Sequence, residues 1–266
     1  MIQSYANYDI GFIEPEHNVN EDFARVKLFN HPQGDIFFAV VADGAGSNGT
    51  QYQPAILAAV QIEEAVERLC RKYPAEFLSS PHVFLEEAMT SASNSLQSFK
   101  IADEQHYNGF ATSLSCVVIH NNRFSFAHTG NTRIHLIRNG NIKQLTVDQT
   151  RGMQDVNDGK ISFTEYHLHR SRLEILGGLG LSATPKIQTF SSVFKENDIM
   201  LLTSDGIHCA LRPDAMLEIL SKCNTCEDSV ESLIKCAKME KYPDNMSAVL
   251  VWNMPEGKDN GNDSQN

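Results

Sequence analysis

The stretch FFAVVADGAGS, residues 37–47, sets an unbroken apolar run directly before an aspartate and two glycines. An apolar run of this length that stops at glycines is typical of a buried strand that ends in a tight turn. Such a strand would hold Asp43 at a fixed place at its end. Asp-Gly is also a common turn dipeptide, so an ordinary turn stays open from this stretch alone. The rest of the chain has to decide between the two interpretations.

The composition is that of a folded, acidic protein. The 266 residues are 41% hydrophobic and 21% charged, and 33 acidic against 22 basic residues give a formal net charge of -11. That sign disfavours a protein that grips nucleic-acid phosphates, although metal ions would still allow phosphate binding. No apolar run approaches the roughly 20 residues of a membrane span, and residues 1–9 lack the layout of a signal peptide. We therefore expect a cytoplasmic protein.

The six cysteines are irregularly spaced, which disfavours a secreted disulfide framework. Cys223 and Cys226 form the only C-x-x-C motif, and no second pair of ligands accompanies it. Reduced thiols are therefore a better interpretation of this motif than a zinc site.

Apolar patterns in the first half of the chain predict strands and two long helices. Strands are expected at 2–12, 23–29 and 37–43, the last two joined as a hairpin by the turn at 30–34. Helices at 54–73 and 81–99 each carry an apolar stripe that would pack on a sheet. Four short β-type runs follow, at 113–119, 124–127, 134–137 and 142–145. Turn signals divide them, the strongest being Asn139-Gly140, and we expect one antiparallel meander.

Residues 148–185 are polar and contain glycines, which predicts an irregular flap with at most short helices. Its role stays open between a structural excursion and a segment that faces the substrate. An apolar strand at 200–204, a helix after the capping box at 225–228 and a last strand at 246–252 complete the pattern. Because no linker divides the chain, we expect one domain over 1–254 and a disordered tail over 255–266.

Acidic residues stand at four strand ends. Carboxylates gathered at one edge of a sheet repel one another unless cations compensate. Hard oxygen ligands, together with a backbone carbonyl such as that of Gly44, suit Mg2+ or Mn2+ better than zinc or copper. Two such ions about 3.5 to 4 Å apart would activate a water for attack on phosphorus, which indicates phosphate ester hydrolysis. The four acidic positions are Glu21-Asp22, Asp43, Asp205 and Asp244.

The ordered motifs around these acids resemble the metal-dependent protein phosphatases, the type 2C or PPM family, over residues 11–252. A chance match would not preserve the order of seven separate stretches. In chain order, the matching stretches are Asn20-Glu21-Asp22, Val41-Ala42-Asp43-Gly44-Ala45-Gly46, Gly109-Phe110-Ala111-Thr112-Ser113, Thr129-Gly130-Asn131-Thr132-Arg133, Leu145-Thr146-Val147-Asp148-Gln149, Leu202-Thr203-Ser204-Asp205-Gly206 and Asp244-Asn245-Met246-Ser247.

The resemblance implies an α+β fold of four layers, α-β-β-α, in which helices flank two antiparallel sheets and two Mg2+ or Mn2+ ions lie at one end of the sandwich. A metal-activated bridging water would hydrolyse phosphoserine or phosphothreonine in a phosphorylated protein, without a covalent enzyme intermediate. The groups that the resemblance assigns to the ions are Asp43 as the bridge, Asp205 and Asp244 on the first ion, Glu21 and the Gly44 carbonyl on the second, and Asp22 through water.

Two positions depart from the family pattern. Where the family usually has an arginine that grips the substrate phosphate, this chain has His17, which offers a single contact and titrates near neutrality. We predict a phosphate affinity that is weaker than the family norm and falls as pH rises, unless His17 is an ordinary loop residue. Asn131 stands where the family commonly has an aspartate for a third metal. Its neutral amide is a poorer ligand for a hard dication and argues against that site.

Three functions stay open from the sequence. An active serine/threonine protein phosphatase is preferred, because none of the strand-end acids is missing. A pseudophosphatase would keep the same fold as a binding or regulatory module. A metal-dependent phosphatase of small phosphoesters would share the mechanism. Neither a nucleic acid nor a membrane is expected as a partner, and nothing in the chain requires more than a monomer.

Overall fold

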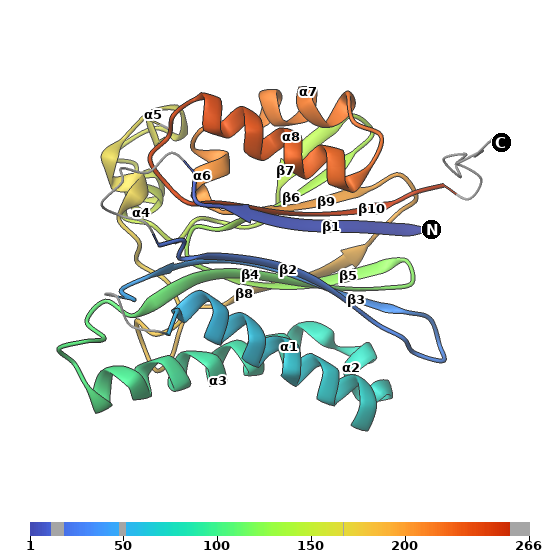
Figure 1. Cartoon of the computed structure of the whole chain (residues 1–266), viewed down its shortest axis with the longest axis horizontal. Helices are drawn as coiled ribbons and strands as arrows, with labels where there is room; N and C mark the ends of the chain where they lie inside the picture. The colour runs from blue at the N-terminus through green and yellow to red at the C-terminus, as the bar shows by residue number, and fades with distance from the viewer. Residues whose placement is uncertain (12–18, 48–51, 167, 256–266) are drawn as a thin grey trace.

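Two antiparallel sheets face each other and carry helices on both outer faces in the computed structural model of the chain, which describes residues 1–11, 19–47, 52–166 and 168–255. Figure 1 shows the four layers from top to bottom as helices, sheet, sheet and helices. The predicted α-β-β-α arrangement is therefore confirmed. The proposed tail and His17 both lie outside the described residues.

The first sheet joins the two ends of the chain, because its strands run in the order β1-β10-β9-β6-β7. Its outer face packs against three helices. One of them, α8, begins at a cap in which the Thr225 hydroxyl accepts a hydrogen bond from the Asp228 main-chain nitrogen at 3.0 Å. The elements are β1 (Ile2–Asp9), β6 (Arg133–Arg138), β7 (Asn141–Gln144), β9 (Ile199–Thr203), α6 (Asp205–His208), α7 (Pro213–Ser221), α8 (Cys226–Met239) and β10 (Met246–Asn253).

The second sheet runs in the order β2-β3-β4-β5-β8 and is covered by the two long helices expected from the sequence. Both helices begin with a proline, which suits the first turn because that position needs no N–H donor. The elements are β2 (Asp22–Phe29), β3 (Ile36–Ala45), α1 (Pro54–Lys72), α2 (Pro74–Ser79), α3 (Pro81–Ala102), β4 (Ala111–His120), β5 (Arg123–Thr129) and β8 (Gln188–Val193).

The unbroken apolar run of β3 follows from its position between two cores. Phe38, Val40 and Ala42 pack toward α1 and α3, whereas Ala39 and Val41 pack toward the other sheet. A strand that is covered on both faces has no polar side, so its sequence does not alternate. The central position of β3, between β2 and β4, thus accounts for the stretch that pointed to the fold.

The predicted single meander over residues 113–145 is wrong, because the chain changes sheets in its middle. β4 and β5 pair in the second sheet, whereas β6 and β7 pair in the first. The crossing occurs at Gly130, which has φ +94° and no room for a side chain, since a Cβ would lie 2.2 Å from the Ser113 hydroxyl. Strands that face the core between two sheets have the same apolar pattern in either sheet, so the sequence did not reveal the crossing. The hairpin at Asn139 and Gly140 is confirmed.

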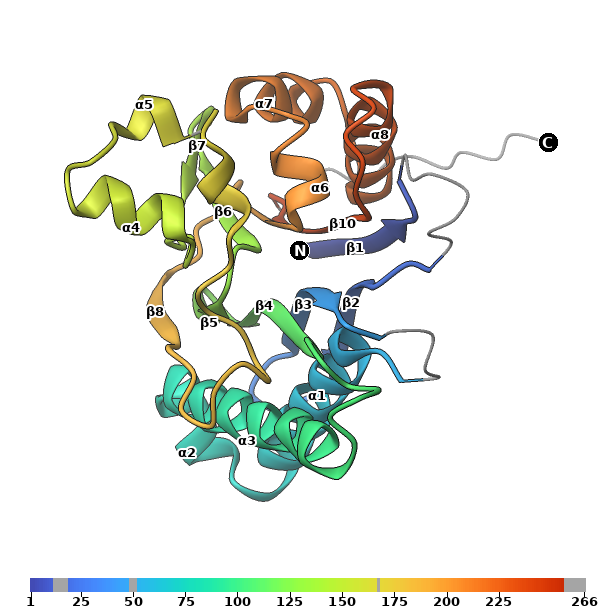
Figure 2. The ribbon, with the colours of Figure 1, turned by 90° about the vertical axis from the view of Figure 1, so that its left-hand side faces the viewer.

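The flap contains three short helical segments, α4 (Arg151–Asn157), α5 (Phe163–Tyr166) and η1 (Arg170–Leu173), as expected from the sequence. Figure 2 shows them beside one end of the sandwich, next to α6. Asp148, the first residue of the flap, joins it to the sandwich, because it accepts a hydrogen bond from the Tyr166 hydroxyl at 2.6 Å and pairs with Arg133 of β6. Within the described ranges, no helix has the length and apolar character needed to cross a membrane.

Candidate metal centre

The β2–β3 ladder brings the first acids together. Asp22 and Asp43 are direct partners in the ladder, and the Gly44 main-chain nitrogen donates to the Glu21 carbonyl oxygen at 3.1 Å. The Thr112 hydroxyl, from β4, donates to the Asp43 carbonyl oxygen at 2.9 Å. Three neighbouring strands therefore fix the main chain around Asp43.

The other two acids come from the first sheet. Asp205 is the first residue of α6, directly after β9, and Asp244 lies just before β10. The two segments touch at Gly206, where a Cβ would lie only 1.9 Å from the Asn245 carbonyl oxygen. A glycine at this position therefore allows the loops that carry Asp205 and Asp244 to lie against each other.

Asn245 links the two sheets at this end of the sandwich. Its side-chain oxygen accepts a hydrogen bond from the Glu21 main-chain nitrogen at 2.8 Å, and its side-chain nitrogen donates to the Ile10 carbonyl oxygen at 3.0 Å. The side chain is buried, so both bonds form away from bulk water. Sequence analysis quoted Asn245 within a motif but gave it no role, because its partners lie more than 220 positions away in the chain.

Burial raises the pKa of all four aspartates, and repulsion by neighbouring acids adds to this for Asp22, Asp43 and Asp244. Burial is the largest cause for each of them, and the charge of Asp205 raises the pKa values of Asp22, Asp43 and Asp244 further. A hydrogen bond between the carboxyl groups of Asp205 and Asp244 lowers the pKa of Asp205 and raises that of Asp244. The four strand ends thus form one electrostatic cluster that favours bound protons or cations.

The chemistry of this acid cluster (Glu21, Asp22, Asp43, Asp205 and Asp244) fits a hard divalent cation. All of its side chains offer carboxylate oxygens, which Mg2+ and Mn2+ prefer. The Oδ2 atom of Asp22 is buried and has no hydrogen-bond partner, a position that is costly unless water or an ion satisfies it.

The carboxylates lie close together, but they are not arranged as the ligands of a metal ion. Among the described residues, no three His, Cys, Asp or Glu side chains form a group that could hold a metal ion. The effect of Asp205 and Asp244 on each other's pKa indicates that their carboxyl groups lie close together. Repelling carboxylates share protons or turn apart in the absence of a cation, so cation binding requires these side chains to reorient.

Glu21 and Asn131 are held by neighbouring groups. The Glu21 Oε1 atom accepts a hydrogen bond from the Ser47 main-chain nitrogen at 2.9 Å, which places its carboxylate against the turn after β3. The Asn131 side-chain nitrogen donates to the Asp205 carboxylate at 3.0 Å, and its oxygen accepts from the Ser113 hydroxyl at 2.8 Å. Asn131 is therefore a neutral donor to the acid cluster in this arrangement.

A buried ion pair supports the cluster from the flap side. Arg133 donates to both oxygens of Asp148, with the shortest contact at 2.6 Å, and both side chains are less than a tenth exposed. Asp148 also accepts hydrogen bonds from Tyr166 and Gln144. The Arg133 charge is the main cause that lowers the pKa of Asp148 against the effect of burial.

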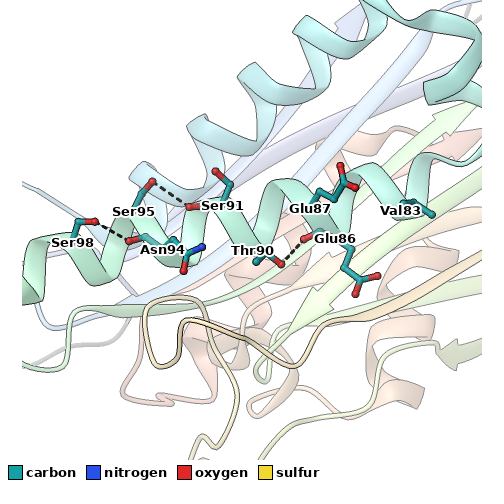
Figure 3. A pocket seen from close by; sticks show the side chains of 8 residues that line it. All are labelled: Val83, Glu86, Glu87, Thr90, Ser91, Asn94, Ser95 and Ser98. Atoms are coloured by element: carbon teal, nitrogen blue, oxygen red, sulfur yellow. Dashed lines mark hydrogen bonds between the residues drawn. The ribbon is translucent and has the colours of Figure 1, made fainter.

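The surface also has a hollow of about 750 Å3 far from these acids, along one face of α3. Figure 3 shows that all of its labelled side chains come from this one helix. The hydroxyls of Thr90, Ser95 and Ser98 donate to carbonyl oxygens of their own helix and are not directed at a ligand. The hollow is a polar helix face, so the acid cluster is the better candidate for the functional site.

Comparisons with known proteins identify the family of this chain. The family model described as "Protein phosphatase 2C" matches residues 15–251. The serine/threonine phosphatase stp of Listeria monocytogenes is 24% identical over 237 residues, which cover 86% of this chain and 92% of that protein. The serine/threonine protein phosphatase PstP of Mycobacterium tuberculosis is 30% identical over 166 residues, which cover 62% of this chain and 32% of that protein.

Solved structures show the same fold. The serine/threonine phosphatase of S. agalactiae superposes with a TM-score of 0.81 at 21% identity, over 95% of this chain and 99% of that one. The catalytic domain of PstP, solved in complex with two manganese ions, gives a TM-score of 0.74 at 23% identity, over 96% and 99% of the two chains. Because the family model matches most of its length, this chain belongs to the protein phosphatase 2C family.

Proposed function

We propose that this protein is a serine/threonine protein phosphatase that depends on two divalent cations, Mg2+ or Mn2+. The observation that carries the proposal is the acid cluster, in which four strand ends from two sheets bring buried carboxylates together and raise their pKa values. The names of the relatives and the two manganese ions in the PstP complex support the same activity.

The residues in the acid cluster would divide the cations between them. Asp43 would hold both ions, as the family resemblance implies, and its place among the other four acids, whose charges all raise its pKa, supports that role. Asp205 and Asp244 would hold one ion, Glu21 and the Gly44 carbonyl the other, and Asp22 would act through water. The ions, when bound, supply an activated water and neutralise charge on the phosphate.

The protein's own groups then orient these ligands. Asn131 donates to one oxygen of Asp205 and the Ser47 nitrogen donates to one oxygen of Glu21, so these two hydrogen bonds orient both carboxylates. Asn245 keeps the Glu21 segment beside the β10 end of the sandwich. His17, which lies outside the described residues, remains the proposed weak contact to phosphate.

Residues 1–254 would act as one domain, because both sheets contribute acids to the same cluster and β1 pairs with β10. A phosphorylated protein is the proposed substrate, and a monomer in the cytoplasm is the proposed state. The described cysteines are all free, which suits a reducing compartment.

The test is hydrolysis of p-nitrophenyl phosphate, a phosphoserine peptide and a small phosphoester, each with and without Mn2+. Wild type should turn over the peptide only with metal, and Asp43→Asn should lose at least two orders of magnitude of that rate. Glu104→Gln, which removes a charge from an exposed carboxylate after the end of α3, is the control. Turnover of the small ester alone would favour a metabolite phosphatase, and no metal-dependent turnover would favour a pseudophosphatase.

A further inference from the structure

A cavity of about 550 Å3 lies beside Asp205, between α6 and the flap, and continues the candidate metal centre toward the flap. Three arginines line it, and two of them are already paired. Arg133 is bound to Asp148, and Arg212 donates to Asp214 at 2.6 Å. Within the described parts of the chain, the third, Arg172, has no carboxylate at ion-pair distance.

Arg172 is directed toward the segments that carry two of the acids. One of its terminal nitrogens donates to the Cys209 sulfur at 2.5 Å, and its guanidinium carbon lies 6.0 Å from the ring centre of Tyr242. Cys209 is one helical turn from Asp205, and its main-chain nitrogen donates to the Asp205 carbonyl oxygen at 2.8 Å. Tyr242 lies two residues before Asp244.

The main chain of Arg172 is held in place within the flap by its contact with α4. Gly152 in α4 approaches it so closely that a Cβ there would lie 2.9 Å from the Arg172 main-chain nitrogen. The Arg151 main-chain nitrogen also donates to the Glu174 carbonyl oxygen at 2.8 Å, which joins α4 to the segment after η1. Arg172 is half-buried, so the surrounding residues restrict where its charged group can lie.

The charges of the metal centre require a further cation. The acid cluster contains five carboxylates, and two divalent ions would neutralise only four of their five negative charges. A phosphate monoester that carries up to two negative charges would then approach a centre with a net negative charge. Arg133 cannot compensate because Asp148 neutralises it, which leaves Arg172 as the unpaired cation of the described cavity.

We propose that Arg172 binds the phosphate that is hydrolysed, so that the flap supplies the cationic contact to the substrate. The guanidinium has five N–H donors, and the contact with Cys209 uses one of them. A planar fork of donors matches two phosphate oxygens better than a point charge does. The inference rests on the proposed function in that a phosphate must bind beside the acid cluster.

The test compares Arg172→Gln with Arg170→Gln, which removes the same charge from an exposed position of the same short segment outside the cavity. Binding of inorganic phosphate to the Mg2+-loaded proteins is measured by calorimetry, and KM is measured for p-nitrophenyl phosphate and a phosphoserine peptide. Arg172→Gln should weaken phosphate binding and raise both KM values about ten-fold or more, with wild-type values in Arg170→Gln. Arg172→Lys should recover part of the loss.

Two results would overturn the proposal. One is equal phosphate affinity in the two glutamine variants while both melt at the wild-type temperature. The other is an increase in KM confined to the peptide, which would make Arg172 a contact to the polypeptide. Because phosphate binding is measured without turnover, the inference can be judged even if wild type hydrolyses nothing, an outcome that would count against the proposed function alone.

Discussion

Asp22 and Asp43 lie directly opposite each other in the β2–β3 ladder, and burial together with neighbouring charges raises the pKa of both. Acidic side chains that face each other across two strands destabilise a sheet. The metal-free protein is therefore less stable because these candidate metal ligands lie close together. This relationship makes metal binding measurable as a change in stability, independently of any reaction.

Asp43→Asn should stabilise the metal-free protein and abolish its stabilisation by Mn2+. Removal of one charge from the acid cluster relieves repulsion worth about 1 kcal/mol or more, which shifts the melting temperature of a domain of this size by about 2–4 °C. Differential scanning calorimetry in EDTA and in Mn2+ measures both effects. Glu104→Gln should change neither value, and an undiminished Mn2+ shift in Asp43→Asn would exclude Asp43 as a ligand.

Asn131→Asp should lower the stability of the metal-free protein and increase the stabilisation that Mn2+ provides. The change replaces a donor that bonds to Asp205 with a carboxylate, at a cost of about 1–3 kcal/mol. Asn131→Ala is the control, since it removes the donor without adding charge. Thermal unfolding across a Mn2+ titration distinguishes them, and equal metal responses of the two variants would refute the expected gain.

Asp148→Asn should destabilise the protein by about 3–5 kcal/mol, because it leaves the buried Arg133 guanidinium without its counter-ion. Combining Arg133→Met with Asp148→Leu should recover much of that loss, since no unpaired charge remains. Urea unfolding measures the difference. The exposed pair of Lys222 and Glu218 supplies the control, and Glu218→Gln should leave the midpoint unchanged. A double variant no better than Asp148→Asn would contradict the argument.

His135→Leu should stabilise the protein and flatten its loss of stability in acid. The imidazole is buried with neither nitrogen hydrogen-bonded, and burial lowers the pKa of His135 to about 3 from an ordinary value near 6.5. Between these values the unfolded chain binds a proton that the native state does not. The free energy of unfolding therefore falls by about 1.4 kcal/mol per pH unit as pH drops below 6.5.

Urea unfolding at pH 7 and pH 5 tests this prediction for His135. The leucine variant should gain about 1–3 kcal/mol at pH 7, because an unsatisfied polar group is removed, and should gain more at pH 5. His128 is similarly buried, and burial lowers its pKa to about 4, but it is bonded to Ser115. His128→Leu should flatten the pH dependence without the gain at pH 7. A parallel pH profile for wild type and His135→Leu would show the assignment to be wrong.

Gly206→Ala should lower the affinity for Mn2+, whereas the fold away from the Asp205 and Asp244 segments should change little. The new Cβ would lie 1.9 Å from the Asn245 carbonyl oxygen, so the Asp205 and Asp244 segments must separate. Gly159→Ala is the control for the general cost of an added side chain, because a Cβ there meets no atom within 4 Å although its φ is +70°. Calorimetric titration with Mn2+ should show weaker binding only for Gly206→Ala, and unaltered affinity would mean that the two segments need not touch.

The sequence predicted the main strands, the long helices and the acids because each leaves a local pattern, whereas the four layers were expected from the family resemblance. The β3 run, the amphipathic α1 and α3, and the hairpin at Asn139-Gly140 each depend on residues a few positions apart. The acids of the site could be named because each follows or precedes a strand, and in the structure the charges of the other four raise the pKa of Asp43. Each of these features depends on residues that are near one another in the sequence.

Contacts between distant segments left no such pattern. The bond between Asn245 and Glu21 joins residues 224 positions apart, and the exchange of sheets at Gly130 depends on which core the next strand completes. The half-exposed edge strand β8 and the four-residue helix α6 have too little periodicity to identify. Arg172 could have been noticed only as a basic residue in the flap, because its lack of an acidic partner is a property of the folded chain.

The pairing of β1 with β10 also sets when the protein can first become active during its synthesis. β10 follows Asp244 and leaves the ribosome after the other strands of the two described sheets, and it must insert between β1 and β9 before Asn245 can reach Glu21. Contacts of such high sequence separation form late, since the longest loops have to close first. A nascent chain shorter than about 250 residues therefore holds three of its acidic segments without the fourth and has no complete centre with which to act on its neighbours.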